Sequence, residues 1–149
     1  MALYDQLFTD LKSALRGGNQ PRVDTLRFVL AGINSAQKDK NVKQPGVALA
    51  DDEIVALLQK EAKRRKEAIE LFKQGNRDDL VQKESADLAV IMEYLPKELS
   101  REEIEKVVAG LRAQGFDDFN SLMREAMKAL KGKADGKLVG EVVKANLGA

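Results

Sequence analysis

The chain has 149 residues with 25 basic and 24 acidic side chains, a balance that excludes nucleic-acid binding driven by overall basicity and leaves only local patches. Cysteine and histidine are both absent, which excludes disulfides, thiolate metal sites and catalytic triads that use histidine. Because the first residues lack a basic leader and no apolar run reaches the ~20 residues of a membrane span, we expect a soluble cytoplasmic protein without membrane, metal or cofactor.

Apolar residues recur at helical spacing along almost the whole chain, and no segment shows the alternation of a strand. The sequence therefore predicts an all-α protein, with about four helices forming N-terminal hairpins and a small three-helix C-terminal bundle. Helices are expected in chain order at about residues 3–15, 21–39, 51–74, 78–95, 100–114, 118–132 and 135–147. Segment 40–50 lacks periodicity and is predicted to be a loop, with Asp51 as the N-cap of the third helix.

A stiff junction at Leu95-Pro96-Lys97 interrupts the helical pattern. After it the apolar pattern restarts in shorter units, the first of which opens with a capping box of Ser100 and Glu103. We therefore expect two domains, residues 1–96 and 97–149.

Two polar residues interrupt the apolar faces of the third and fourth expected helices. Arg65 and Glu84 lie at similar distances from the turn at Gly75-Asn76, so an antiparallel hairpin brings them within about one helical turn. The sequence predicts an ion pair between Arg65 and Glu84, with Asp87 as the alternative acceptor. The competing interpretation is that Arg65 extends to solvent over its aliphatic stem.

The turn between the last two expected helices is the most suggestive local feature. Residues 124–144 carry six basic and three acidic side chains. Two glycines permit close backbone approach, and Asp135 is placed to cap a helix whose first amides attract anions. The candidate phosphate-binding residues are Lys128, Lys131, Lys133, Asp135, Gly136 and Lys137. The alternative is an ordinary connection with solvated lysines.

A second basic cluster lies on the third expected helix, at residues 60–66. Its lysines and arginines alternate with glutamates at helical spacing, which is typical of a solvated helix face. Neither cluster supplies an arrangement of Asp, Glu or Lys that predicts chemistry, so we assign no catalytic residue.

Several strings resemble one family, and the resemblance covers about residues 3–147. They are LRFVLAGI, QKEAKRRKEAIELF with GNRDDL, EYLPKELSREE and MKALKGKADGKLVGEVVK, and they resemble the GatB/YqeY family. The C-terminal part is similar to the tail domain of the B subunit of aspartyl/glutamyl-tRNA amidotransferase. That resemblance implies contact with the tRNA body through the candidate phosphate-binding residues. Most family members have arginine where this chain has Lys133, and lysine lacks the planar fork of arginine.

The resemblance implies an association with carbon-nitrogen ligase activity that uses glutamine as the amido-nitrogen donor. The chain contains neither the catalytic cradle nor the glutaminase machinery, so such an activity requires a complex. Our first hypothesis is a tRNA-binding or accessory protein whose C-terminal domain contacts the tRNA body. The alternative is a helical protein-interaction adaptor without direct RNA binding. An amidotransferase or an aminoacyl-tRNA synthetase is the protein partner implied in either case.

Overall fold

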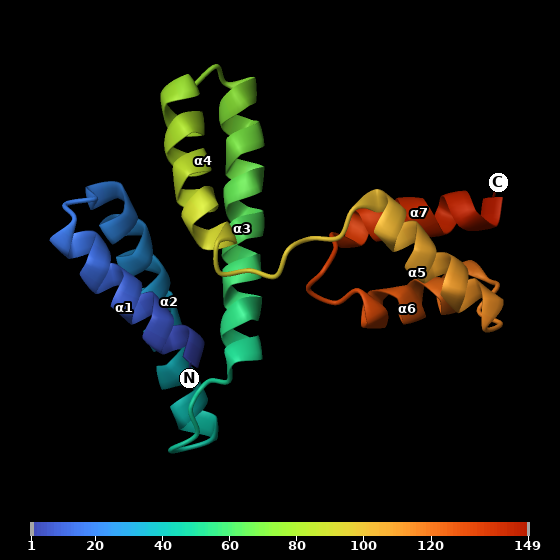
Figure 1. Ribbon diagram of the computed structural model, residues 1–149, viewed down its shortest axis with the longest axis horizontal. Coiled ribbons are helices and arrows are strands. Elements are labelled where there is room, and N and C mark those ends of the chain that lie inside the picture. Colours follow the sequence, from blue (N-terminus) through green and yellow to red (C-terminus); the bar gives the residue numbers. More distant parts are fainter. Residues whose placement is uncertain (1, 149) are drawn as a thin grey trace. The chain divides into compact units, whose positions relative to one another are not determined.

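The computed structural model describes residues 2–148. Within this range the chain forms seven α-helices and no strand, which confirms the predicted all-α class (Figure 1). The helices are α1 (Ala2–Arg16), α2 (Gln20–Lys43), α3 (Asp51–Gln74), α4 (Asp78–Met92), α5 (Arg101–Ala113), α6 (Phe119–Ala129) and α7 (Gly136–Gly148). The chain divides into two compact units, one ending at Leu95 and the other beginning at Pro96, one residue before the expected break.

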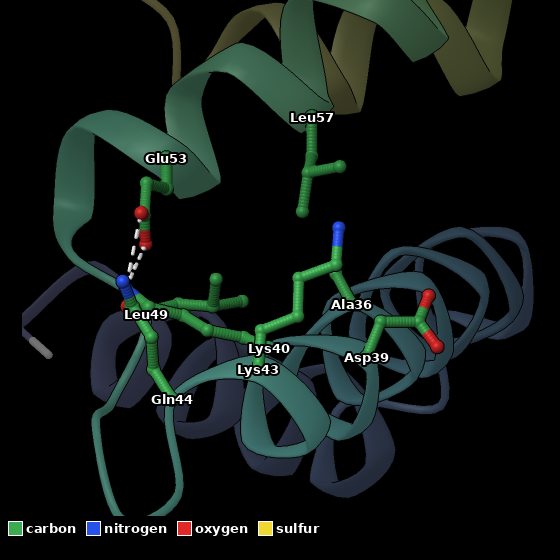
Figure 2. A pocket seen from close by; sticks show the side chains of 8 residues that line it. All are labelled: Ala36, Asp39, Lys40, Lys43, Gln44, Leu49, Glu53 and Leu57. Carbon is green, nitrogen blue, oxygen red and sulfur yellow. Dashed lines mark hydrogen bonds and ion pairs between the residues drawn. The ribbon is translucent and has the colours of Figure 1, made fainter.

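The last turn of α2 lies inside the segment that the sequence analysis expects to be a loop. Helix α2 continues to Lys43 because residues of its last turns make long-range contacts. The Gln37 amide oxygen accepts from the Leu49 amide at 2.7 Å. Lys40 Nζ lies 2.8 Å from Glu53 Oε2, as Figure 2 shows. The loop is therefore shorter than predicted, and these two interactions connect α2 to the end of the loop and to the start of α3.

The start of α3 also differs from expectation. Ala50, not Asp51, occupies the N-cap position, and the Glu53 carboxylate accepts from the Ala50 amide at 3.0 Å. Asp51 is the first helical residue, and its Oδ1 instead accepts from the Leu3 amide at 3.3 Å. Sequence spacing identifies an acidic helix start correctly but cannot assign which carboxylate caps it.

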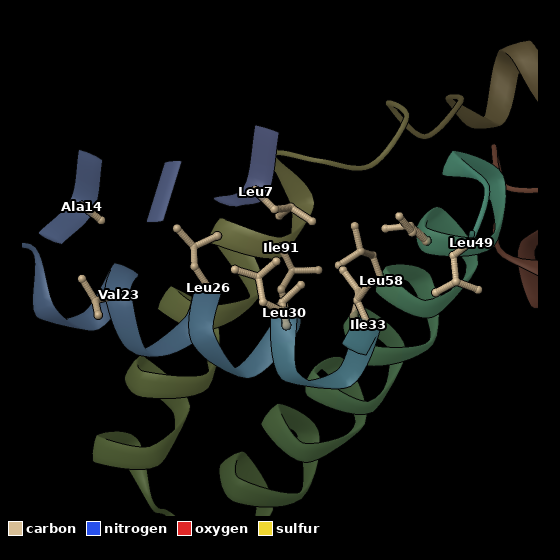
Figure 3. Close-up of a cluster of buried hydrophobic side chains, with 12 residues drawn as sticks. Leu7, Ala14, Val23, Leu26, Leu30, Ile33, Leu49, Leu58 and Ile91 are labelled. Atoms are coloured by element: carbon tan, nitrogen blue, oxygen red, sulfur yellow. The ribbon is translucent and has the colours of Figure 1, made fainter. Parts of the chain in front are cut away.

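The N-terminal unit is built from two helical hairpins, α1 with α2 and α3 with α4. Their apolar faces share one core, in which Leu7, Leu26, Leu58 and Ile91 represent the four helices and are at most 2% exposed (Figure 3). Leu15 of α1 is 48% exposed, whereas its neighbour Ala14 is 5% exposed and belongs to the core.

The C-terminal unit packs α5, α6 and α7 around a second core. Its fully buried residues include Ile104, Leu122 and Val139. Ser100 caps α5 by accepting from the Glu103 amide at 3.2 Å, and Asp118 caps α6 by accepting from the Ser121 amide at 2.7 Å. Phe119 and Met127 lie at the edge of this unit's core, since about two fifths of the surface of each is exposed.

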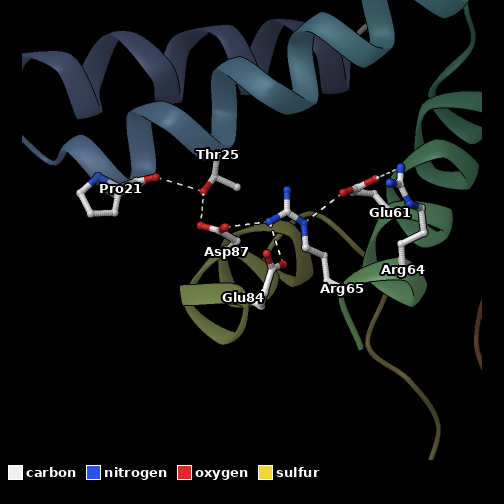
Figure 4. Close-up of polar contacts among 7 residues, drawn as sticks. All are labelled: Pro21, Thr25, Glu61, Arg64, Arg65, Glu84 and Asp87. Carbon is white, nitrogen blue, oxygen red and sulfur yellow. Dashed lines mark hydrogen bonds and ion pairs between the residues drawn. The ribbon is translucent and has the colours of Figure 1, made fainter. Parts of the chain in front are cut away.

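Arg65 is the centre of a polar network within the N-terminal unit. Its Nη1 lies 3.0 Å from Glu84 Oε2 and 2.7 Å from Asp87 Oδ2, so the two acceptors that the sequence offers as alternatives are both used (Figure 4). Its Nε donates to Glu61 Oε1 at 3.0 Å. The Arg65 side chain is only 13% exposed and does not extend to solvent.

The network reaches a third helix through Thr25 of α2. The Thr25 hydroxyl is buried and lies 2.9 Å from Asp87 Oδ1 and 3.0 Å from the Pro21 carbonyl oxygen (Figure 4). The guanidinium of Arg65 also lies 5.1 Å from the centre of the Phe28 ring. Burial acts to lower the pKa of Arg65, but Glu61, Glu84 and Asp87 outweigh it and hold that pKa above its ordinary value.

We predict that Arg65→Met lowers the free energy of unfolding by about 3 kcal/mol, because it leaves three largely buried carboxylates without their shared cation. Urea denaturation at neutral pH measures the change. Arg64→Met is the matched control, since Arg64 is 70% exposed and its single ion pair with Glu61 is 3.4 Å long. The control should cost less than about 0.5 kcal/mol. Equal losses in the two variants would contradict the network's role.

A second polar cluster joins α1 and α2 to the turn that follows α4. Tyr94 Oη donates to Asp10 Oδ2 at 2.5 Å, and Arg22 Nη1 lies 2.8 Å from Glu93 Oε2. Burial of the phenol, together with the bond to Asp10, raises the pKa of Tyr94 well above its ordinary value of 10.0. The unfolded chain therefore loses the phenolic proton before the folded protein does.

Tyr94 should accordingly make stability fall as the pH rises above about 10. We predict that Tyr94→Phe is less stable than the wild type by about 1 kcal/mol at pH 8, because it lacks the hydrogen bond to Asp10. The difference should narrow from pH 10 upward, as the wild type loses the contribution of the neutral phenol. Urea denaturation of both proteins across this range is the measurement, and a constant difference would contradict the prediction.

Candidate nucleic-acid interface

The turn between α6 and α7 is shaped by one left-handed glycine. Helix α6 ends at Ala129 rather than at Gly132 as expected, and the Leu130 amide makes the last helical bond to the Ala126 carbonyl at 2.9 Å. Gly132 has a φ of 75°, a conformation that glycine adopts without steric cost. The Lys133 amide then donates back to the Leu130 carbonyl at 2.9 Å. These bonds close a tight turn directly after the helix.

The same turn is anchored from outside by the segment that precedes α5. The Leu99 amide donates to the Lys133 carbonyl oxygen at 2.8 Å, and the Leu99 side chain packs against the C-terminal core. This long-range bond holds the backbone of Lys133 in place while its side chain remains exposed. Leu99 was not predicted as part of the site, because nothing in the local sequence pattern indicates a bond across more than thirty residues.

Three lysines of the turn are exposed cations without an acidic partner. Lys131, Lys133 and Lys137 are exposed, and among residues 2–148 no carboxylate forms an ion pair with any of them. Lys128 is also exposed but lies 3.4 Å from Glu125 Oε1, one helical turn away. The structure therefore places the candidate lysines on one short turn and its flanking helix ends, and partly neutralises only Lys128.

Asp135 does not act as the side-chain cap that the sequence predicts. Its backbone carbonyl accepts from the Val139 amide at 3.0 Å, which opens α7, while its exposed carboxylate makes no hydrogen bond within the described residues. By helix geometry the first amides of α7 have no intrahelical acceptor. The positive end of this thirteen-residue helix therefore lies beside Lys133 and Lys137 in the chain.

Gly136 has a packing role that the sequence analysis missed. A Cβ built there would lie 3.4 Å from Met127 Cε, and one at Gly140 would lie 3.6 Å from Met123 Cε. Methionines four residues apart on α6 thus cover glycines four residues apart on α7. The expected close approach of a foreign backbone at Gly136 is taken instead by a methionine side chain of α6. The matching four-residue spacing was the signal available in the sequence.

The part of the chain that the structure describes contains no group of three or more acidic side chains arranged to hold a metal ion. No helix in that part is both long and apolar enough to cross a membrane. The chemistry that the turn offers is the binding of anions by lysines and helix amides.

We predict that Gly132→Ala destabilises the protein by about 1 kcal/mol, because an L-residue is strained at positive φ. Gly136→Ala should change stability by less than about 0.5 kcal/mol, since its Cβ meets only ordinary van der Waals contact. Urea denaturation of the full chain compares the two substitutions. A larger loss at Gly136 than at Gly132 would contradict the geometry of the turn.

The chain matches known proteins along almost its whole length. The family model described as Yqey-like protein covers residues 4–147. The chain is 32% identical to "Altered inheritance of mitochondria protein 41, mitochondrial" of Pyrenophora tritici-repentis, over 97% of this chain and 80% of that protein. It is 31% identical to the protein of the same name from Lachancea thermotolerans, over 93% of this chain and 75% of that protein.

These relatives correct one expectation and establish the family. Because both are named as mitochondrial, they overturn the cytoplasm as the expected location. The prediction of the location was wrong because it rested on the composition of the first residues of the given sequence, which does not identify a compartment. Neither match shows the similarity to the tail of the amidotransferase B subunit. The family model and both relatives together show that the chain belongs to the YqeY-like family.

Proposed function

We propose that this protein binds tRNA, with the α6–α7 turn of its C-terminal unit contacting the backbone of the tRNA body. The proposal is based on three exposed lysines, at residues 131, 133 and 137, that lie next to the N-terminus of α7 and form no ion pair within residues 2–148. Phosphate oxygens are the acceptors that such a combination of ammonium groups and helix amides favours.

Because the net charge of the chain is close to zero, RNA binding by this protein would point to a local group of cations such as this turn. A strongly basic protein binds RNA through many scattered cations, whereas here the acidic residues offset most of them. Binding through this turn would therefore depend on few phosphates. Lysine presents a point charge rather than a planar fork, which favours recognition of backbone and shape over base-specific contacts.

The proposal extends to an accessory role in amidotransferase chemistry. It rests on the resemblance of the KADGKLV turn to the tail domain of the amidotransferase B subunit. In this role the turn would hold the tRNA while a partner amidotransferase or aminoacyl-tRNA synthetase acts on the acceptor end. We assign no catalytic residue to the chain, so any carbon-nitrogen ligase activity with glutamine as the donor belongs to the complex.

Removing the three turn lysines should abolish most of the tRNA affinity. We predict that the triple variant Lys131→Ala, Lys133→Ala, Lys137→Ala binds bulk tRNA at least ten-fold more weakly than the wild type at low salt. The slope of log affinity against log salt should also fall by up to about three, because each lost phosphate contact releases about one counterion fewer. Filter binding or fluorescence anisotropy across a salt series measures both quantities.

A matched control distinguishes the effect of losing the turn lysines from the effect of losing any three positive charges. Lys38, Lys63 and Lys83 are exposed lysines of the N-terminal unit without ion pairs in the described range. Changing all three to alanine removes the same charge and should leave tRNA affinity within two-fold of wild type. Equal loss in the two triple variants, or absence of binding by the wild type, would contradict the proposal.

A further inference from the structure

Two neighbouring hollows lie between α2 and α3 in the N-terminal unit, and we refer to the two together as the groove. It consists of two hollows of about 380 and 210 Å³, and Leu57 lines both of them. Figure 2 shows Leu57 of α3 facing side chains of α2 across the larger hollow. On α2 the groove extends from Phe28 to Lys43, a length of about 22 Å at the helical rise. This length matches about four turns of a third helix.

The groove has an apolar floor and a rim with unpaired positive charge. Its two paired acids, Glu53 and Glu61, are bound by Lys40 and by Arg65. Lys43 and Lys60 line the groove without any ion pair in the part of the chain that the structure describes. Among residues 2–148 these two cations outnumber the one lining acid that forms no ion pair, Asp39, which leaves the rim complementary to carboxylates.

Gly32 is an independent sign that the groove accepts another chain. It lies in the interior of α2, where glycine costs up to about 1 kcal/mol relative to alanine, and it lines the smaller hollow. A Cβ built on Gly32 would meet no heavy atom within 4 Å, so no packing inside the protein requires glycine there. A glycine without an internal role, facing an open groove, permits close approach by a bound helix.

An exposed aromatic residue marks the end of the groove next to Gly32. Phe28 is 50% exposed although its ring lies against the guanidinium of Arg65. The network around Arg65 therefore holds the ring in place with one face open. Exposed aromatic rings on a rigid support are typical anchor points for a partner protein.

We propose that this groove binds one acidic amphipathic helix of a partner protein, about four turns long. The apolar face of that helix lies on Leu57 and Phe28, its carboxylates meet Lys43 and Lys60, and its backbone passes close to Gly32. The interaction goes beyond the proposed tRNA contact and does not depend on it, since every residue involved belongs to the N-terminal unit. It gives the adaptor alternative a defined surface.

The test uses the full chain and two fluorescent, stapled helical peptides of about 16 residues. One carries a leucine face flanked by glutamates, and the other has the same leucine face flanked by lysines. Fluorescence anisotropy should show at least ten-fold tighter binding of the acidic peptide at low salt. Equal affinity for the two peptides, or no binding of the acidic peptide up to 1 mM, would overturn the proposal.

Two variants test whether the peptide binds in the groove. Gly32→Leu fills the hollow and should reduce acidic-peptide affinity at least ten-fold, with a thermal midpoint at or above that of the wild type, because leucine favours the helix. Ser35→Leu adds the same side chain to α2 outside the groove and should leave the affinity within two-fold. Unchanged binding by Gly32→Leu would overturn the proposal.

A charge reversal tests the complementarity separately. The double variant Lys43→Glu, Lys60→Glu should bind the acidic peptide at least ten-fold more weakly than the wild type. The control variant Lys38→Glu, Lys63→Glu carries one change on each of the same helices, outside the groove. It should change the affinity for this peptide less than two-fold. Sedimentation measures whether a second copy of the chain occupies the groove instead. A dimer that Gly32→Leu dissociates, or displacement of the peptide by tRNA, would each overturn the acidic-helix partner.

Discussion

One arginine sets the geometry of the N-terminal unit. Arg65 of α3 binds Glu61 on its own helix and two acids of α4, and Thr25 of α2 joins the same cluster through Asp87. Three carboxylates around one cation would repel one another without it, so the three helices have few alternative registers that satisfy all the charges. Phe28, which lines the smaller hollow, lies against the guanidinium at the centre of this network.

In the C-terminal unit, backbone hydrogen bonds and glycine residues fix the geometry of the α6–α7 turn, as the Arg65 network fixes that of the N-terminal unit. Gly132 turns the chain, the bond from Leu99 to Lys133 fixes the turn, and Met127 of α6 lies beside Gly136 of α7. These interactions involve backbone groups and residues on the inner face of the turn. The lysine side chains project outward because the groups that hold the turn do not use them, and a rigid support for unpaired cations is what phosphate recognition requires.

Local patterns predicted the helices and the partners of Arg65, because helical periodicity and distance from a hairpin turn are both properties of adjacent sequence. Glu61, four residues before Arg65 on the same helix, was a local signal that was not used, whereas Thr25 was not predicted because its contact with Asp87 depends on how helices pack in space. The end of α2 and the cap of α3 were wrong for the same reason, with Gln37, Lys40 and Leu3 supplying long-range contacts. The candidate turn lysines were found because glycine, lysine and a helix start are close in sequence. The groove was missed, although Gly32 in a helix interior was a visible signal.

The most direct test of the account is to map the amide resonances of the isotope-labelled full chain by NMR during titration with tRNA. If the α6–α7 turn binds tRNA, the earliest and largest shifts occur at residues 131–137 and at the first amides of α7, while Gly32, Leu57 and Lys60 remain unchanged. Shifts confined to α2 and α3, or no shifts at saturating tRNA, would contradict it.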